Sequence, residues 1–357
     1  MPRRSEFDAL AVVSAGARTA VGSTLRETSV ALRAGLAPFA EHAFFVDRDG
    51  NPVILAQDEE LGPQPSVCER MCELLRSAVR EVLSSAGTLQ SRTVQVFIGL
   101  PASRPGVRDD CRSRVCEIVH REVGTAFDIT RVDVVEQGHA SGLAALHEGA
   151  AAMRSCGDDL LLICGVDSYV DPDAIDWLEM NDQLHCERNP WGFVPGEAAA
   201  AVMLARAADA ARFGACPMAS VEGTAVARER ALIKTSDVCV GRGLTEAIQG
   251  AVSSLHPSAR IATLMCDMNG EPYRADELGY ARVRMAHLFV DPSFVTPVEC
   301  CGDVGAASGA LFAALATMSG VASGEGHTLL STSGEDGLRA AVVMSVQSRP
   351  EDQVRWV

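Results

Sequence analysis

The sequence predicts a layered α/β protein built from two similar units. Short apolar segments alternate with helical segments along its 357 residues. The apolar segments are nearly continuous, as in strands that are covered on both faces. Strands that alternate with helices favour a largely parallel sheet. In each half of the chain a strand or loop leads into a helix of small residues, which indicates two copies of one unit.

Eight short runs are expected to be buried strands because apolar residues dominate them. They lie, in chain order, at residues 9–14, 94–99, 132–135, 159–165, 200–204, 263–267, 328–331 and 340–346. Four longer segments are expected to be helices, because their apolar residues are three to four positions apart or because they consist of small residues. These helices lie at 65–86, 142–155, 243–255 and 305–318.

These elements divide the chain into an N-terminal half, residues 1–207, and a C-terminal half, residues 216–348. Residues 349–357 are expected to form a tail. The segment 41–63 is acidic and contains two prolines, so we expect it to be an excursion at the surface.

The formal net charge of −16 argues against several classes of partner. A negative field repels nucleic-acid phosphates and anionic bilayers, so we expect neither nucleic acid nor membrane as a partner. No window reaches the roughly 18–20 apolar residues that a membrane span needs. The first residues do not form a signal-peptide pattern. We therefore expect a soluble, cytoplasmic protein.

The 12 cysteines contain no C-x-x-C pair and no zinc-finger spacing, so we expect thiols in a reducing compartment. No phosphate-binding loop of the G-x-x-x-x-G-K-[ST] type occurs, and no cofactor is expected.

The most informative segment is 132–204. It resembles the core of the β-ketoacyl synthases, which are condensing enzymes of the thiolase superfamily. Residues 10–35 are also similar to the first strand and helix of that family, so the resemblance covers most of the chain. The runs that carry it are Ala140-Ser141-Gly142-Leu143, Gly165-Val166-Asp167 and Gly192-Phe193-Val194-Pro195-Gly196-Glu197.

The resemblance implies the thiolase fold, in which two similar βαβαβαββ halves form a five-layer αβαβα arrangement. It also implies a homodimer formed through the first half, and an active site between the two halves. It implies binding residues at Ser141, Phe193, Asn269 and Glu335, with Glu335 near the mouth of the site.

The catalytic positions of the family are altered in this sequence. His139 matches the nucleophilic Cys, and Asp267 and Asp303 match the two catalytic His residues. Condensation uses a thiolate for acyl transfer and two imidazole donors for the oxyanion. Two carboxylates cannot donate to that oxyanion, so we expect a protein that does not condense. The helix that follows His139 disfavours an imidazolium, so a neutral ring is expected unless a carboxylate lies nearby.

Three hypotheses for this site remain open. In the first, the site is degenerate and His139 bridges Asp267 and Asp303. In the second, His139 is a general base that an Asp orients, and the protein is an acyltransferase, decarboxylase or thioesterase acting on acyl thioesters. In the third, which we favour least, the three residues bind a metal. Our expectation is that no metal is bound. Cys266 and Cys301 are expected to be core thiols.

Two motifs are similar to thiolase-like proteins of type VI secretion gene clusters, namely DMNGEPYRADELGYAR at 267–282 and CCGDVGAASGA at 300–310. The resemblance implies an accessory, scaffolding or acyl-binding role in effector loading. The implied partners are a second copy of the chain and an acyl carrier protein or a secretion-system protein.

Overall fold

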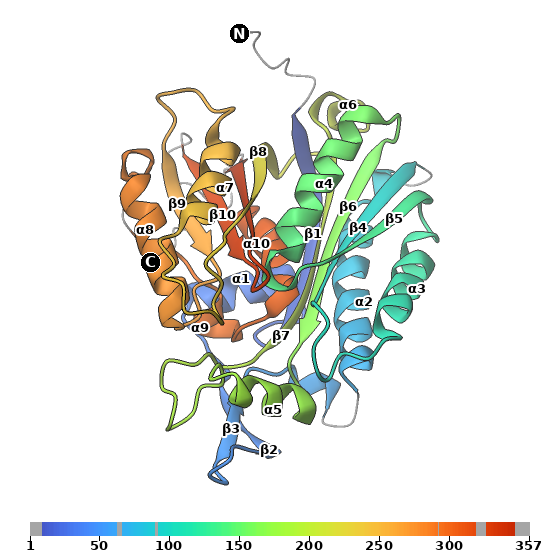
Figure 1. Ribbon diagram of the computed structural model, residues 1–357. Helices are drawn as coiled ribbons and strands as arrows, with labels where there is room; N and C mark the ends of the chain where they lie inside the picture. Colours follow the sequence, from blue (N-terminus) through green and yellow to red (C-terminus); the bar gives the residue numbers. More distant parts are fainter. Residues whose placement is uncertain (1–8, 63–65, 90–91, 292, 319–325, 347–357) are drawn as a thin grey trace.

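The computed structural model describes residues 9–62, 66–89, 92–291, 293–318 and 326–346 (Figure 1). The predicted tail, 349–357, lies outside the described residues. The described strands are β1 (Leu10–Thr19), β2 (Ala40–Val46), β3 (Pro52–Leu55), β4 (Thr93–Leu100), β5 (Asp128–Glu136), β6 (Leu160–Ser168), β7 (Glu197–Arg206), β8 (Ala219–Arg228), β9 (Ile261–Cys266), β10 (His327–Ser333) and β11 (Leu338–Val346). The α-helices are α1 (Leu25–Arg33), α2 (Val67–Ser85), α3 (Cys111–Val123), α4 (Ser141–Ser155), α5 (Pro172–Met180), α6 (Ala207–Arg212), α7 (Arg242–Val252), α8 (Pro272–Arg284), α9 (Val298–Cys301) and α10 (Ser308–Ala316).

Nine of the described strands form one sheet in the order β5-β4-β6-β7-β1-β8-β11-β10-β9, and β2 and β3 form a separate hairpin. The sheet repeats one pattern on either side of the β1–β8 junction. Moving outward from β1, the pairings with β7, β6 and β4 are antiparallel, antiparallel and parallel. Moving outward from β8, the pairings of β11, β10 and β9 follow the same order. The four strands nearest the junction therefore repeat one topology in the two halves, as the sequence predicts. The first half adds β5 beyond β4, and this strand has no counterpart among the described strands of the second half.

Helices cover both faces of the sheet and also lie between its halves (Figure 1). α2 and α3 pack on the outer face of the first half, and α7 and α8 on the outer face of the second. α4 and α10 share one core with the inner faces of both halves. Successive side chains of β6 alternate between these cores: Leu161 and Ile163 face α4 and α10, while Leu160 and Leu162 face α2. The result is the expected five-layer arrangement.

The central helices α4 and α10 touch through two glycines. A Cβ atom on Gly142 would lie 2.6 Å from the backbone nitrogen of Ala310. A Cβ atom on Gly309 would lie 2.4 Å from the backbone nitrogen of Leu143. Side chains at either position would push the helices apart, so glycine is required for this contact.

The two central helices begin in the same way. The turn η4 (Gly138–Ala140) precedes α4, and the turn η6 (Gly305–Ala307) precedes α10. Both turns begin with a glycine of positive φ, +55° at Gly138 and +48° at Gly305. The repeated pattern G-x-A-S-G places His139 in the first half at the position that Ala306 occupies in the second.

Each expected strand overlaps a strand of the nine-stranded sheet, and the four expected helices overlap α2, α4, α7 and the η6–α10 segment. Several elements were not predicted from the sequence, namely β8, the β2–β3 hairpin and the helices α3, α5, α6, α8 and α9. The expected excursion at 41–63 contains the β2–β3 hairpin, which projects from the body in Figure 1. Phe44 on β2 is 73% exposed, whereas Val53 and Leu55 on β3 are buried and anchor the hairpin. The boundaries of the halves at 207 and 216 stay a prediction.

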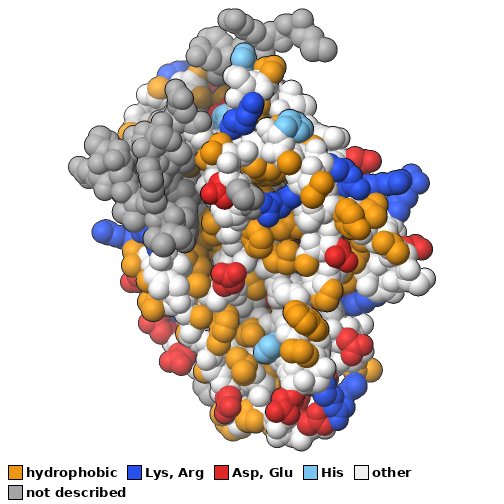
Figure 2. All heavy atoms as spheres, turned by 90° about the vertical axis from the view of Figure 1, so that its left-hand side faces the viewer, with side chains coloured by type: hydrophobic (Ala, Val, Ile, Leu, Met, Phe, Trp, Pro, Cys, Tyr) orange, Lys and Arg blue, Asp and Glu red, His pale blue; other side chains and the backbone are white. Residues whose placement is uncertain are grey.

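Among the described residues, no helix has both the length and the apolar character that crossing a membrane requires. Figure 2 shows the face of the molecule that carries α8. Hydrophobic side chains lie there among acidic and basic ones, so no single sign of charge dominates this face despite the net charge of −16.

Candidate functional site

His139 and Asp303 form a buried ion pair at the centre of the molecule. His139 lies in the η4 turn that opens α4, and Asp303 lies in the loop between α9 and η6. The Nε2 atom of His139 lies 2.8 Å from Oδ1 and 2.9 Å from Oδ2 of Asp303. His139 is 4% exposed and Asp303 is 1% exposed. Two of the three residues at the family's catalytic positions therefore meet.

The carboxylate of Asp303 accepts two further hydrogen bonds. The backbone N–H of Gly305 donates to Oδ1 at 2.8 Å, and Nδ2 of Asn269 donates to Oδ2 at 2.7 Å. Burial alone would raise the pKa of Asp303, but the charge and hydrogen bond of His139, the charge of Arg274 and the hydrogen bond from Asn269 lower it well below its usual range. Asp303 is therefore a carboxylate.

The environment of His139 favours the charged ring. Burial alone would lower the pKa of His139, but the Asp303 carboxylate outweighs that effect and raises the pKa above its ordinary value. A neutral His139 was expected only if no carboxylate lay near the ring, and Asp303 is such a carboxylate. The contact with Asp303 thus favours the imidazolium form of His139, which donates through Nε2 to the carboxylate.

Asp267 does not take part in this pair, contrary to the hypothesis that His139 bridges both aspartates. Its Oδ2 atom accepts a hydrogen bond from Nη1 of Arg274 at 2.8 Å and from the backbone N–H of Ser333 at 2.7 Å. A guanidinium is permanently charged and can donate to several acceptors at once. Arg274 is therefore a better partner for the buried Asp267 carboxylate than His139, whose Nε2 atom is already paired with Asp303.

Arg274 is a central residue that the sequence analysis did not identify. It lies in the first turn of α8, is 5% exposed, and also donates from Nε to Oε2 of Glu271 at 3.0 Å. Burial alone would lower the pKa of Arg274, but Asp267 and Glu271 raise it above its ordinary value. A signal was present in the sequence, because Arg274, Leu278 and Ala281 share the buried stripe of α8.

Gln183 links this network to the surface. Its Nε2 atom donates to Oε1 of Glu271 at 2.9 Å and to Oε1 of Glu335 at 2.7 Å. Lys234 donates to the other oxygen of Glu335 at 2.9 Å. Burial alone would raise the pKa of Glu335, but the hydrogen bonds from Gln183 and Lys234 lower it. Asn269, another expected binding residue, connects the His139–Asp303 pair to this network. Its Nδ2 atom donates to Glu271 at 3.0 Å as well as to Asp303.

The two other expected binding residues have structural contacts. Ser141 Oγ donates to the carbonyl of Leu100 at 2.8 Å and accepts from the N–H of Gln137 at 2.8 Å, so it ties the start of α4 to β4. Phe193 is buried beside the ring of Tyr169, with the ring centroids 5.7 Å apart.

An open pocket of about 510 Å³ lies outside Gln183 and Glu271. We call it the Trp191 pocket. It is lined by Asn181, Asp182, Gln183, Asn189, Trp191, Ile233, Lys234, Glu271, Pro272 and Tyr273. The polar network of Gln183 and Glu271 therefore lies between this pocket and the His139–Asp303 pair.

The cysteines nearest to the altered positions are not activated. Cys301 and Cys266 are buried, and burial raises the pKa of each thiol to about 12. A protonated thiol is a poor nucleophile. Both residues are therefore the core thiols that we expected.

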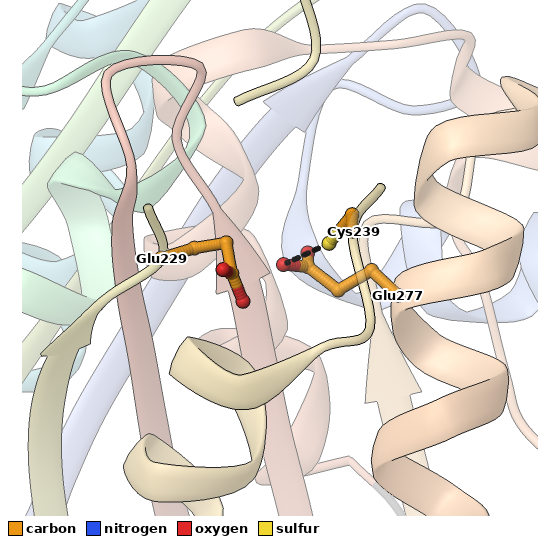
Figure 3. A group of neighbouring side chains, drawn as sticks. All are labelled: Glu229, Cys239 and Glu277. Atoms are coloured by element: carbon orange, nitrogen blue, oxygen red, sulfur yellow. Dashed lines mark hydrogen bonds between the residues drawn. The ribbon is translucent and has the colours of Figure 1, made fainter. Parts of the chain in front are cut away.

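Among the described residues, the one group of three metal-ligand atoms within 4.8 Å of one another is Glu229, Cys239 and Glu277 (Figure 3). The residues His139, Asp267 and Asp303 do not form such a group. The two carboxylates in Figure 3 already accept hydrogen bonds from the protein itself. Glu229 accepts from the N–H groups of Arg230, Ala231 and Gly243, and Glu277 accepts from Arg339, Ser333 and Cys239. These internal donors, among them the guanidinium of Arg339, satisfy the carboxylates without a metal ion.

Comparisons with known proteins identify the fold. No protein-family model and no curated protein sequence matches the chain. Solved structures of ketosynthases do match. The ketosynthase from module 6 of the bacillaene synthase from Bacillus subtilis 168 has a TM-score of 0.76 at 15% identity, over 95% of this chain and 72% of that chain.

Two further matches cover whole chains. A type II polyketide synthase acyl-carrier protein in complex with its ketosynthase has a TM-score of 0.79 at 14% identity, over 98% of this chain and 100% of that chain. The ishigamide ketosynthase/chain length factor has a TM-score of 0.77 at 16% identity, over 97% and 100%. At such identities the likeness shows the fold alone. The chain has the thiolase fold of ketosynthases, as its sequence predicts.

Proposed function

We propose that this chain is a ketosynthase-like protein that does not condense and that acts as an accessory, scaffolding or acyl-binding subunit. The observation that carries the proposal is the buried ion pair between His139 and Asp303. His139 occupies the position that the family resemblance assigns to the nucleophile, and its Nε2 atom lies 2.8 Å from Asp303.

The chemistry of this pair argues against condensation. An acyl-enzyme intermediate needs a thiolate, and an imidazolium has no lone pair with which to attack a thioester. An oxyanion needs donors, but Asp267 and Asp303 are carboxylates whose charges are held by Arg274 and His139. An anion that developed beside them would be repelled.

Intact-mass spectrometry tests this part of the proposal. The protein would be incubated with acetyl- and malonyl-coenzyme A, beside an active ketosynthase as a positive control. We expect no acyl adduct on the protein. A stoichiometric adduct on His139 or on a residue that surrounds the His139–Asp303 pair would overturn the proposal, because it would reveal a working nucleophile.

The solved structures suggest the kind of partner. One neighbour is a ketosynthase in complex with an acyl-carrier protein, and another is a ketosynthase/chain length factor. We propose an acyl carrier protein or a secretion-system protein as the partner here. The resemblance to thiolase-like proteins of type VI secretion clusters supports the second choice. Pull-down from the native host, followed by reconstitution of the purified pair, tests it.

We also propose a homodimer formed along β5. This strand is one edge of the sheet, and it has nine residues. Edge strands carry unpaired backbone groups that can pair with another chain. If two β5 strands paired antiparallel about Val132, Arg131 of one copy would lie opposite Asp133 of the other. The strand is therefore complementary to itself in charge.

One observation favours a second candidate function. The 2.8 Å bond between His139 and Asp303 is the kind of contact that orients a general base. In that case the protein would be an acyltransferase, decarboxylase or thioesterase that uses His139.

A further inference from the structure

Two side-chain amides that line the Trp191 pocket have their N–H groups hydrogen-bonded within the protein, so their oxygens remain as acceptors. Nδ2 of Asn181 donates to the carbonyl of Trp177 at 2.7 Å. Nδ2 of Asn189 donates to the carbonyls of Asp182 and Leu184 at 2.7 and 3.3 Å. These bonds fix the orientation of both amides and leave their oxygens for other donors. The carboxylate of Asp182 has no hydrogen bond or ion pair to any described residue.

One lining residue of the pocket also has a buried acceptor without a partner. Gln183 is 2% exposed, and its Oε1 atom has no hydrogen-bond partner. The amide cannot be flipped to remedy this, because Oε1 would then face the carboxylates of Glu271 and Glu335. This Oε1 atom is shielded from solvent, so Gln183 contributes to the pocket as a fixed part of its wall.

The walls of the pocket are apolar and aromatic. Trp191 is 66% exposed, which is unusual for so large a side chain, and Ile233, Pro272 and Tyr273 also line the pocket. An indole ring attracts a cation to its face, and apolar walls suit a chain of methylene groups. The pocket thus combines surfaces for an alkyl stem with acceptors for a polar head.

Lys234 is the one cationic side chain among the described residues that line the pocket, and its charge does not prevent a cationic ligand from binding. Lys234 lies 2.9 Å from Glu335 and 4.5 Å from the centre of the Trp177 ring. Its charge is compensated by Glu335, while Asp182 keeps an uncompensated negative charge. The net charge of −16 also favours approach by a cation.

We infer that the Trp191 pocket binds an alkyl-guanidinium or alkyl-ammonium group. The source is either an arginine or lysine side chain of a partner polypeptide or a free small amine. The head would lie against Asp182 and the amide oxygens of Asn181 and Asn189, and the stem against Trp191. This inference goes beyond the proposed function and does not depend on whether His139 is catalytic.

Calorimetric titration of the full chain tests the inference. The probes are N-acetyl-arginine amide, its uncharged analogue N-acetyl-citrulline amide and the free amine agmatine. We expect the arginine probe to bind at least about fivefold more tightly than the citrulline probe, because only the former forms charge-assisted hydrogen bonds. Raising the salt concentration should weaken binding. Equal affinity for the arginine and citrulline probes would overturn the inference.

Variants localise the effect. Asp182→Asn removes the free charge and keeps the backbone, because asparagine tolerates the positive φ of 54° at this position. We expect it to weaken binding of the arginine probe at least about fivefold. Asp176→Asn is the matched control, since Asp176 is an exposed acid of α5 that does not line the pocket. Equal loss in the two variants, or no loss in Asp182→Asn, would contradict the inference.

The probes also separate the two sources. If the amidated arginine residue, and peptides that extend it, bind more tightly than agmatine, the ligand is a side chain of a polypeptide. If agmatine binds as tightly as the longest peptide, the pocket accepts a free amine. Either result supports a site for a cationic head on an alkyl stem.

Discussion

The imidazole Nε2 of His139 lies 2.8 Å from Oδ1 of Asp303, although the two residues are 164 positions apart in the sequence. His139 opens the central helix of the first half, and Asp303 precedes the central helix of the second. Their contact therefore joins the two halves at the point where the family resemblance expects a nucleophile and its partner.

The ion pair should make stability depend on pH in a defined way. The pKa of His139 is raised from 6.5, so its contribution to stability is complete below 6.5 and is lost as the pH rises through the folded-state pKa. The pKa of Asp303 is lowered from 3.8, so its contribution is present above 3.8 and is lost as the pH falls through the folded-state pKa. The pair thus stabilises most between these two ordinary values.

Urea unfolding of the wild type and of His139→Ala measures this dependence. The difference in free energy of unfolding between the two proteins should be largest near pH 5 to 6 and should shrink in alkaline solution. His256→Ala, at an exposed histidine, is the control and should show little pH-dependent difference. A difference between wild type and His139→Ala that is constant from pH 5 to pH 10 would contradict the assigned protonation.

Arg274 should be essential for the buried carboxylates around it. Arg274→Met removes the cation shared by Asp267 and Glu271, so both lose a charged donor in a buried site. We expect the free energy of unfolding to fall by about 3–5 kcal/mol. Adding Asp267→Asn should restore part of the loss, because it removes one of the uncompensated charges. Chemical denaturation of the wild type, the two single variants and the double variant gives the coupling energy between Arg274 and Asp267. Strictly additive effects of the two substitutions would refute the prediction.

The contact between the central helices should not tolerate a methyl group. Gly309→Ala would place Cβ 2.4 Å from a backbone atom of α4, and we expect a loss of roughly 2 kcal/mol or more of stability. Gly279→Ala is the matched control in α8, where a Cβ atom meets nothing within 4 Å. That variant should be neutral or stabilised by up to about 1 kcal/mol. Thermal unfolding of the two variants checks the prediction, which fails if they behave alike.

Charge on β5 should control dimer formation if the proposed dimer is correct. Arg131→Asp would place two carboxylates opposite each other in each of two symmetric pairs. We expect the dissociation constant of the dimer to rise roughly fivefold or more. Sedimentation or light scattering over a concentration series measures it. The double variant Arg131→Asp, Asp133→Arg should recover dimer formation, and a failure to respond to either change would place the interface elsewhere.

Much of the fold could be predicted from the sequence because the strands are apolar throughout. Runs such as 159–165 and 200–204 lie in strands that are buried on both faces, so their composition alone marks them. β8 was missed because buried and part-exposed side chains alternate along it without a continuous apolar run. The hairpin was missed because most of β2 is exposed.

The site was only partly predictable for a physical reason. The motif frame located His139, Asp267 and Asp303, since their glycine neighbours are part of local turns. The partners of Asp267 and Glu335 are Arg274 and Gln183, and the contacts of Gln183 span 88 and 152 positions. No local pattern encodes such contacts. The stripe of α8 could have indicated Arg274, because an arginine there must be buried with a partner.

The most direct test of the central claim is the turnover of malonyl thioesters. The purified chain would be supplied with malonyl-coenzyme A and malonyl-loaded carrier protein, and release of carbon dioxide and formation of a condensed product would be followed. We expect neither above the rate without protein, and no difference between wild type and His139→Ala. Turnover that His139→Ala abolishes and His256→Ala leaves intact would contradict the account and establish His139 as a catalytic residue.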